Sequence, residues 1–183
     1  GDMIAFLHGQ KEIDDAVGHI QALLKQHRPD LARRTDVIRL YRGVPQGEQD
    51  LAIKDKKDAA RMRIIVSSNM AETSLTIDGI VHVVDSGAIK IAEWNPLSRS
   101  KPLKTMTHSR FGCKQRWGRA GRKTSGHAWT LYAEAQFKDD AIFVQETPPE
   151  IRRTPLDQAV LTARKAGAER LAGGAFPWLD RPE

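Results

Sequence analysis

The sequence predicts an α/β fold in which a parallel sheet carries helices on both faces. Short apolar runs, each long enough for one buried strand, recur through the first 132 residues. Segments with apolar residues three or four positions apart lie between several of these runs, as expected of amphipathic helices. Because parallel neighbours need a crossover connection, which a helix usually supplies, this alternation favours a helix-covered parallel sheet.

Five segments account for the sheet, and each is short, apolar and bounded by turn residues. We expect these strands at Met3–His8, Asp36–Tyr41, Met62–Ser68, Gly79–Gly87 and Gly126–Tyr132. Gly9 ends the first strand, and a helix follows it with apolar residues at positions 13, 16, 17, 20, 23 and 24. A second helix is expected after Pro45, since proline is favoured in the first turn of a helix.

The region from Ala88 to Thr107 breaks this pattern. Two alternating stretches flank the turn residues "NPLSRS", which predicts a β-hairpin that projects from the α/β body. A helix is expected from about His108. Further along, the proline-rich "ETPPEIRRTP" predicts an extended connector, and Leu156–Gly167 predicts a helix that Gly167 caps. We therefore divide the chain into a domain at 1–147 and a linker with a short helical extension at 148–183.

Composition excludes several classes of protein. Hydrophobic residues make up 40% of the 183, enough for a packed core, and no apolar stretch approaches the roughly 18 residues of a membrane span. The apolar run "MIAFL" near the start is too short for a signal peptide. Cys113 is the one cysteine, so an internal disulfide is excluded and a reducing compartment, the cytoplasm, is expected. The six histidines lie far apart without cysteines at zinc spacing, and we expect no structural metal.

Positive charge is concentrated in one segment. Residues 86–123 contain ten Lys or Arg and one acidic residue, Glu93, so this segment carries +9 in a chain whose net charge is +6. The remainder is therefore slightly acidic, at −3. Such a concentration is typical of a surface that binds nucleic acid or phosphate, although a merely solvated basic surface would have the same composition.

Within this segment, "QRWGRAGR" (Gln115–Arg122) places three arginines and two glycines in eight residues. A solvated basic helix is one explanation, and a flexible glycine–arginine tract that binds RNA is another. A third is a set of fixed arginines that await a polyanion, whose charge would offset the repulsion among the cations.

Four stretches resemble, in order and at similar spacing, the motifs of the second RecA-like domain of the DEAH-box helicases of superfamily 2. These are "FLHGQKEI", "LYRGVPQGEQ", "SSNMAETSLTIDGIVHVVDSG", which is similar to motif five over its whole length, and "QRWGRAGR", which is similar to motif six. The stretch "PPEIRRTPLDQAVLTARKAG" resembles the linker and first helix of the winged-helix domain that follows in this family, here truncated. The resemblance covers nearly the whole chain and implies a RecA-like fold and an ATP-dependent RNA helicase.

The resemblance implies ATP with Mg²⁺ as cofactor, but the sequence contains neither a G-x-x-x-x-G-K-[ST] phosphate loop nor a DEAH tetrapeptide. "GRKTSG" does not match the loop, because Arg122 separates Gly121 from Lys123. In the family both motifs, and with them the metal ligands, belong to the first RecA-like domain. We therefore expect that domain of the same protein as the partner, a monomeric enzyme, and no ATP hydrolysis by this chain alone.

The resemblance assigns Arg119 and Arg122 as arginine fingers, which stabilise the charge that develops during ATP hydrolysis. On a helix these arginines would lie three residues apart on one face, with Gln115 one turn earlier on the same face. The resemblance assigns Gln115 to orient the attacking water. Arg116 would point elsewhere and have a structural role, and Trp117 would pack in the core or between domains.

In motif five, hydroxyl and amide side chains follow a strand, at the edge where open α/β sheets face their ligands. By resemblance, Ser68, Asn69, Thr73 and Thr76 hold the sugar–phosphate backbone of single-stranded RNA, Ser74 senses the γ-phosphate, and Asp78 binds the ribose. Each of these residue types is also favoured in helix caps and turns, so a local structural role is the alternative. Many relatives have an adenine-stacking phenylalanine where this chain has Ile53, which predicts looser base selectivity.

The role of the hairpin and the function of the whole protein both remain open at this stage. The hairpin carries Lys90, Arg99, Lys101 and Lys104, and it either guides the nucleic-acid strand, as implied by the family, or is a solvated basic ribbon. Trp94 either packs the hairpin onto the core or stacks on a base. An RNA-binding RecA-like module without a catalytic partner is the main alternative to a motor domain, and a protein-interaction scaffold is a third. Binding of DNA in addition to RNA also stays open.

Overall fold

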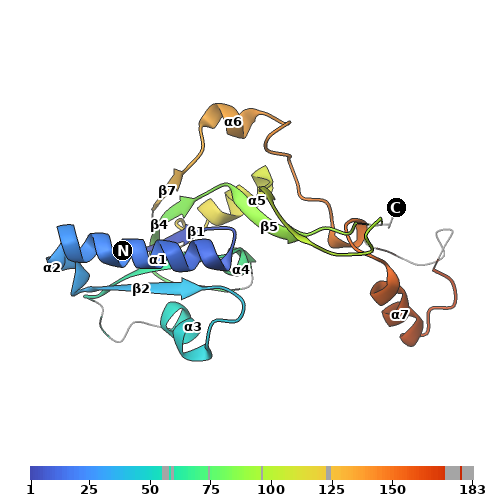
Figure 1. Cartoon of the computed structure of the whole chain (residues 1–183), viewed down its shortest axis with the longest axis horizontal. Coiled ribbons are helices and arrows are strands. Elements are labelled where there is room, and N and C mark those ends of the chain that lie inside the picture. Colours follow the sequence, from blue (N-terminus) through green and yellow to red (C-terminus); the bar gives the residue numbers. More distant parts are fainter. Residues whose placement is uncertain are drawn as a thin grey trace. The chain divides into compact units, whose positions relative to one another are not determined.

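The computed structural model describes residues 1–54, 58, 60–73, 75–95, 97–122, 125–171 and 178. Its centre is a five-stranded sheet with strand order β2-β3-β1-β4-β7 and parallel pairing throughout (Figure 1). The strands are β1 (Asp2–Phe6), β2 (Thr35–Leu40), β3 (Met62–Ser67), β4 (Ile80–Asp85) and β7 (His127–Thr130). The predicted parallel α/β fold is thereby confirmed, and each strand lies within its predicted range or begins one residue before it.

Helices cover both faces of this sheet. The main ones are α1 (Gln10–His27), α3 (Gln46–Ile53), α4 (Met70–Thr73) and α5 (Arg110–Trp117). Val17 of α1 packs in one apolar cluster with Val66 of β3. Ala52 of α3 packs in a second cluster with Ile65, the residue before Val66. Since successive residues of a strand point to opposite faces, the two clusters lie on opposite sides of the sheet, as the sequence predicted.

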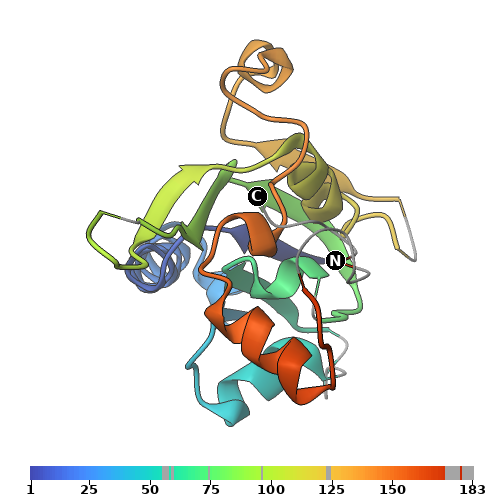
Figure 2. The same ribbon diagram turned by 90° about the vertical axis from the view of Figure 1, so that its right-hand side faces the viewer.

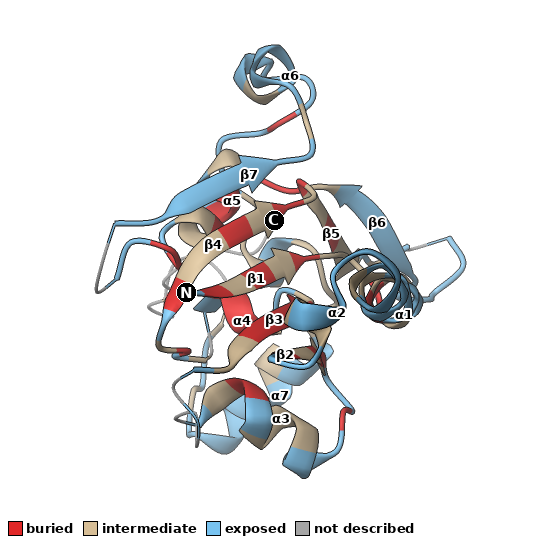
Figure 3. Cartoon of the chain, turned by 90° about the vertical axis from the view of Figure 1, so that its left-hand side faces the viewer, coloured by how far each residue is buried: buried red, intermediate tan, exposed pale blue. Residues whose placement is uncertain are grey.

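The central strands and the edge strand differ in burial. Every residue of β3 after Met62 is buried, whereas all four residues of β7 are exposed (Figure 3). The large side chain of Trp129, on β7, is 57% exposed. The core of the fold therefore lies around β1, β3 and β4, and β7 forms one open edge of the sheet.

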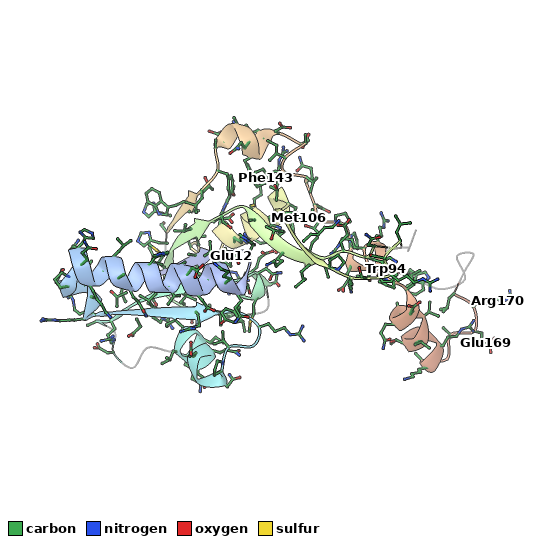
Figure 4. The ribbon with its side chains drawn as sticks, viewed as in Figure 1. Glu12, Trp94, Met106, Phe143, Glu169 and Arg170 are labelled. Carbon is green, nitrogen blue, oxygen red and sulfur yellow. The ribbon has the colours of Figure 1, made fainter. Side chains whose placement is uncertain are left out.

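The predicted hairpin consists of β5 (Ala88–Ala92) and β6 (Leu103–Thr107), which pair as a separate two-stranded sheet. The chain forms two compact units, and the base of the hairpin belongs to the first, with the described residues of 1–90 and 105–146. Its distal part, 91–104, belongs to the second, with the described residues from 147 onward. There, the N–H of Trp94, labelled in Figure 4, donates to the carbonyl of Arg153 at 3.1 Å.

Some short helices were missed by sequence analysis. They are α2 (Pro29–Ala32), α6 (Glu134–Lys138) and the 3₁₀ turn η1 (Glu150–Arg152). Segments of three to five residues cannot show the apolar periodicity on which helix prediction depends. The helix predicted at 156–167 is α7 (Asp157–Lys165), red in Figure 2, with Gly167 at φ 91° just after it. Within the described part of the chain, every helix is too short or too polar to cross a membrane.

Candidate functional site

The motif-six segment, residues 115–122, begins on α5 and continues as a turn. The hydroxyl of Ser109 caps α5 by accepting a main-chain N–H at 3.2 Å, and the helix ends at Trp117. The prediction that Arg119 and Arg122 project from one face of a helix is therefore wrong. Both arginines lie in the turn after α5, where their guanidinium groups bond to the loop that follows α4.

Gln115, Arg119 and Arg122 nevertheless line one open pocket, with a volume of about 320 Å³. The rest of its described lining consists of Glu72, Thr73 and Gly118. Two guanidinium groups and a side-chain amide form a lining suited to an oxyanion such as phosphate. Among the residues that the structure describes, no group of three or more His, Cys, Asp or Glu side chains could hold a metal ion.

Arg119 is the more buried of the two arginines, with 8% of its surface exposed. Its Nη1 donates to the carbonyl of Leu75 at 2.7 Å, and its Nη2 donates to the carbonyl of Glu72. Burial lowers the pKa of Arg119 from its usual value, and the nearby charge of Arg122 acts in the same direction. An anion in the pocket would therefore offset the repulsion between these two cations.

Arg122 is held more loosely. It is exposed, and its Nη1 donates to the hydroxyl of Thr76 at 3.3 Å, a long hydrogen bond to a residue that is itself exposed. Breaking such a bond at the surface costs little, because water replaces the lost partner. Arg122 can thus turn toward an anion without disturbing the fold, whereas Arg119 must exchange two buried carbonyl partners.

Arg116, the other arginine of motif six, is fully buried at the carboxyl edge of the sheet. Its Nε donates to Oε2 of Glu72 at 3.0 Å, and its Nη1 donates to Oδ1 of Asp85 at 2.8 Å. The guanidinium carbon also lies 5.1 Å from the ring centroid of Phe6. Buried charges persist only when they are paired, so these contacts fasten α5 to α4 and to the end of β4. This agrees with the structural role expected for Arg116.

Further side chains join these ionic contacts in a group that we term the carboxyl-edge cluster: Glu72, Asp85, His108, Arg116, Trp117 and Tyr132. Nε2 of His108 lies 2.9 Å from Oε2 of Glu72. The indole N–H of Trp117 and the hydroxyl of Tyr132 both donate to Oδ2 of Asp85, at 3.1 Å and 3.0 Å. Sequence analysis missed Glu72, Asp85 and His108. The available signal was an acid at the end of an apolar strand, "VHVVD", where an unpaired carboxylate would be costly.

Two weak acids, Cys113 beside this cluster and Tyr132 within it, are held neutral. Cys113 is fully buried, and burial, followed by the charge of Asp85, raises the pKa of its thiol to about 12. Burial also raises the pKa of Tyr132, whose hydroxyl bonds to Asp85. Both groups therefore contribute packing and hydrogen bonds at neutral pH, and Cys113 has none of the thiolate character of a reactive cysteine.

The residues predicted to hold RNA follow β3 along motif five. Ser68 is partly buried, and its hydroxyl accepts the N–H of the residue two positions on at 3.4 Å. Asn69, Thr73 and Thr76 are exposed. Thr73 also lines the pocket, so motif five extends from the carboxyl edge of the sheet to the two arginines. Ser74 lies outside the described residues.

Asp78 lies at the other end of motif five. It lies two residues before β4, at the amino edge of the sheet, and it is not part of the described pocket lining. Ile53, the last residue of α3, is partly buried against the core. Asp78 and Ile53 thus lie outside the described lining of the pocket that contains Gln115, Arg119 and Arg122.

The cations of the distal hairpin are partly paired with acids. Nζ of Lys104 lies 2.6 Å from a carboxylate oxygen of Glu93, and Nζ of Lys101 lies 3.7 Å from one of Glu150. These half-exposed pairs lower the positive charge that the hairpin offers to a nucleic acid. A role of the hairpin in guiding the strand stays a prediction.

The chain matches the protein family described as the helicase conserved C-terminal domain over residues 1–124. It is 34% identical over 172 residues to the probable ATP-dependent RNA helicase DHX35 of Homo sapiens, and equally to DHX35 of Pongo abelii. Each match covers 93% of this chain but only 24% of the human protein and 23% of the Pongo protein. The chain thus spans about a quarter of the length of these curated relatives.

Solved structures show the same likeness. A crystal structure of the Escherichia coli DExH-box NTPase HrpB matches with a TM-score of 0.77 and 28% sequence identity. A second crystal structure, described as the E. coli DEAH/RHA helicase HrpB, matches with a TM-score of 0.76 and 28% identity. Both matches cover 100% of this chain and about a fifth of the solved chain, 21% and 22%.

Proposed function

Because this chain belongs to the helicase conserved C-terminal domain family, as its motifs five and six predicted, we propose that it is one of the two motor domains of an ATP-dependent RNA helicase. The chain is a C-terminal RecA-like helicase domain, and its likeness to DHX35 and HrpB supports the DEAH-box branch. The proposed activity is hydrolysis of ATP coupled to movement along single-stranded RNA. The buried, free thiol of Cys113 is consistent with the reducing cytoplasm, where we place the protein.

The observation that carries this proposal is the pocket lined by Gln115, Arg119 and Arg122. Hydrolysis spreads negative charge over the transferred phosphoryl group, and well-placed guanidinium groups accelerate such reactions by about 10³ to 10⁵. We assign Arg119 and Arg122 as the arginine fingers that neutralise this charge. The side-chain amide of Gln115 orients the attacking water from the same pocket.

ATP and Mg²⁺ are bound, in this proposal, mainly by the first RecA-like domain of the same protein, which supplies the phosphate loop and the metal ligands. The fingers then reach the phosphates only when the two domains close. Hydrolysis is thereby tied to a domain movement. The structure supports a division of labour between the fingers: Arg122 can turn to the phosphates freely, whereas Arg119 must leave the carbonyls of Leu75 and Glu72.

Single-stranded RNA is the proposed nucleic-acid partner. Ser68, Asn69, Thr73 and Thr76 offer hydroxyl and amide groups on one stretch of chain, and such groups bind the sugar–phosphate backbone without reading sequence. The hydrogen bond between Thr76 and Arg122 supports a link between RNA and ATP. RNA that engages Thr76 would release Arg122 toward the phosphates. The γ-phosphate sensing by Ser74 and the ribose contact of Asp78 complete the proposal.

A non-catalytic RNA-binding module is the second candidate function. It is favoured by the contacts that Arg119 and Arg122 make within the chain, since a domain that never meets ATP would keep both arginines in these places. The two candidates differ in what a complete protein does. A motor hydrolyses ATP when RNA is bound, whereas a module binds RNA and leaves ATP intact.

The experiment compares this chain alone with the protein that contains both RecA-like domains. We expect RNA-stimulated ATP hydrolysis from the two-domain protein and none from the chain alone. Both should bind single-stranded RNA with an affinity that falls steeply with salt, since the contacts are to phosphates. Turnover by the chain alone would contradict the shared site. A two-domain protein that binds RNA without hydrolysing ATP would favour the module, and single-stranded DNA of the same sequence tests the choice of nucleic acid.

A further inference from the structure

Arg63, at the start of β3, is a buried cation that takes no part in the function proposed above. It is 4% exposed, and its Nε donates to Oδ2 of Asp2 at 2.8 Å. The other carboxylate oxygen of Asp2, which is fully buried, accepts the main-chain N–H of Arg63 at 3.0 Å. This double contact fixes the guanidinium group at the amino edge of the sheet, between β1 and β3.

The other donors of this guanidinium group bind main-chain carbonyls in two separate segments. Nη1 donates to the carbonyls of Ala52 and Lys54, both at 3.0 Å. These carbonyls lie at the C-terminal end of α3, where the helix itself provides no partners. Nη2 donates to the carbonyl of Asp78 at 2.8 Å, in the loop that leads to β4. A single side chain thus ties the end of α3 to the last part of motif five.

Both tied segments carry residues of the predicted nucleoside site. Ile53, which replaces the adenine-stacking phenylalanine of many relatives, lies between Ala52 and Lys54. Asp78 is the residue expected to bind the ribose. We propose that Arg63, oriented by Asp2, is a positioning residue that sets the spacing between the base-covering Ile53 and the ribose-binding Asp78. This inference rests on the proposed function, because it needs a nucleotide at this edge of the domain.

The expected consequence is on nucleotide affinity and not on the chemical step. Base and ribose do not change charge during hydrolysis, so contacts to them hold the ground state and the transition state equally. Losing their correct spacing raises KM for ATP and leaves kcat unchanged. The arginine fingers have the opposite signature, because they face charge that develops only in the transition state. The two sets of residues are therefore separable by kinetics.

A purely structural role of Arg63 predicts a different result. If the guanidinium group only stabilised the fold, its loss would reduce the fraction of active protein. The apparent kcat would then fall in proportion to that fraction, and KM would stay the same. The split between KM and kcat thus distinguishes positioning from stability.

The test uses Arg63→Lys in the protein that contains both RecA-like domains. Lysine keeps the charge opposite Asp2, but its ammonium group lacks the planar fork that reaches both carbonyl sets. We expect KM for ATP and the Kd of a fluorescent ADP analogue each to rise about tenfold, with kcat within about twofold of the parent. Arg61→Lys is the matched control, since Arg61 pairs with Asp36 and lies two residues away on the chain; both constants should stay unchanged.

Unchanged nucleotide affinity in Arg63→Lys, or a lower kcat with unchanged KM, would overturn the proposal. If Arg63→Lys fails to fold, Asp2→Asn decides the question, because it loosens the orientation of Arg63 and should raise the same Kd by a smaller factor. The binding measurement also separates this proposal from the proposed function. If the parent binds ADP normally but shows no RNA-stimulated hydrolysis, the motor function is contradicted. If the parent hydrolyses ATP when RNA is bound and Arg63→Lys has the same nucleotide affinity as the parent, only the positioning role is contradicted.

Discussion

Arg116 and Arg63 are buried at opposite edges of the same parallel sheet, and they use their hydrogen bonds differently. At the carboxyl edge, Arg116 joins two side-chain carboxylates, those of Glu72 and Asp85. At the amino edge, Arg63 pairs with one carboxylate, that of Asp2, and gives its remaining donors to main-chain carbonyls. The first arrangement fixes the orientation of a helix, and the second fixes the main chain at the end of α3 and in the loop before β4.

This difference suits what each edge is proposed to do. Arg116 fastens α5 to the sheet, and Ala120, in the turn after the helix, packs in the core. Arg119 and Arg122, in that turn, contact the motif-five loop and are proposed to exchange these contacts for a phosphate. At the amino edge nothing needs to move, and main-chain hydrogen bonds hold a constant spacing. Motif six therefore contains one fully buried arginine, Arg116, and two, Arg119 and Arg122, that line the pocket.

The largest effect is expected from Arg116→Met. This change leaves two buried carboxylates without their cation, which typically costs about 3–5 kcal/mol of unfolding free energy. Urea denaturation of this chain measures the loss. Adding Glu72→Gln and Asp85→Asn to the variant should restore part of it, because no unpaired charge then remains. A loss below about 1 kcal/mol in the single variant would show that the carboxyl-edge cluster does not hold α5.

A smaller loss is expected from Asp2→Asn at the amino edge. The change removes one charged partner of Arg63, and hydrogen bonds to charged groups contribute about 1.5–3 kcal/mol. The carbonyls of Ala52, Lys54 and Asp78 still accept from the guanidinium group, which limits the damage. The same denaturation measurement applies. If Asp2→Asn lowers the unfolding free energy as much as Arg116→Met does, the proposed difference between the carboxyl edge and the amino edge is contradicted.

Alkaline pH should weaken the carboxyl edge selectively. The folded-state pKa of the Cys113 thiol is raised to about 12, above its ordinary value of 9.0, and that of Tyr132 is raised as well. A raised pKa contributes stability below the unfolded pKa, and this contribution is lost as the pH rises above about 9. The unfolding free energy should therefore fall between about pH 9 and pH 12.

Cys113→Ala provides the control for this pH dependence. The variant lacks the titrating thiol, so its unfolding free energy should decline less steeply over the same range. Identical pH profiles for the two proteins would show that the buried thiol does not contribute. The amino edge has no such group among the described residues at Arg63, and Asp2→Asn should leave the profile unchanged.

The smallest effect is expected from Arg61→Gln. Arg61 forms a partly exposed ion pair with Asp36 at the amino edge, and surface pairs of this kind contribute little to stability. The unfolding free energy of the Arg61→Gln variant should not differ measurably from that of the parent. A loss comparable to that of Asp2→Asn would contradict this comparison. It would mean that the contribution of Arg63 to the unfolding free energy comes from its charge and not from its burial and main-chain hydrogen bonds.

The sheet and the main helices were predictable because they follow from local patterns. The apolar run that contains Ile65 and Val66 indicates a buried strand, and Val17 lies in a run with helical spacing. The resemblance of motif six also predicted Gln115, Arg119 and Arg122 as one group of site residues. In the structure all three line one pocket.

The details that depend on distant partners could not be predicted. Arg119 lies in the turn after α5, where carbonyls more than forty positions earlier accept its donors, and no local pattern encodes that contact. Asp2 and Arg63 are 61 residues apart, and the parallel pairing of β1 with β3 is what brings them together. In the sequence, Asp2 and Arg63 are single charged residues near the starts of two strands. Nothing there indicates that they form a pair, which only the folded structure shows.

Steady-state ATPase kinetics of the two-domain protein, with and without RNA, test the central claim that the pocket-lining arginines of motif six face ATP. The variants are Arg119→Ala, Arg122→Ala, Ser68→Ala and Thr76→Ala. We predict that each arginine variant lowers kcat by roughly 10³-fold with little change in KM, since fingers act on the transition state. The hydroxyl variants should weaken RNA stimulation and leave basal hydrolysis intact. If Arg122→Ala keeps the parent kcat and loses only RNA affinity, the basic cluster faces nucleic acid, and the assignment of the fingers is contradicted.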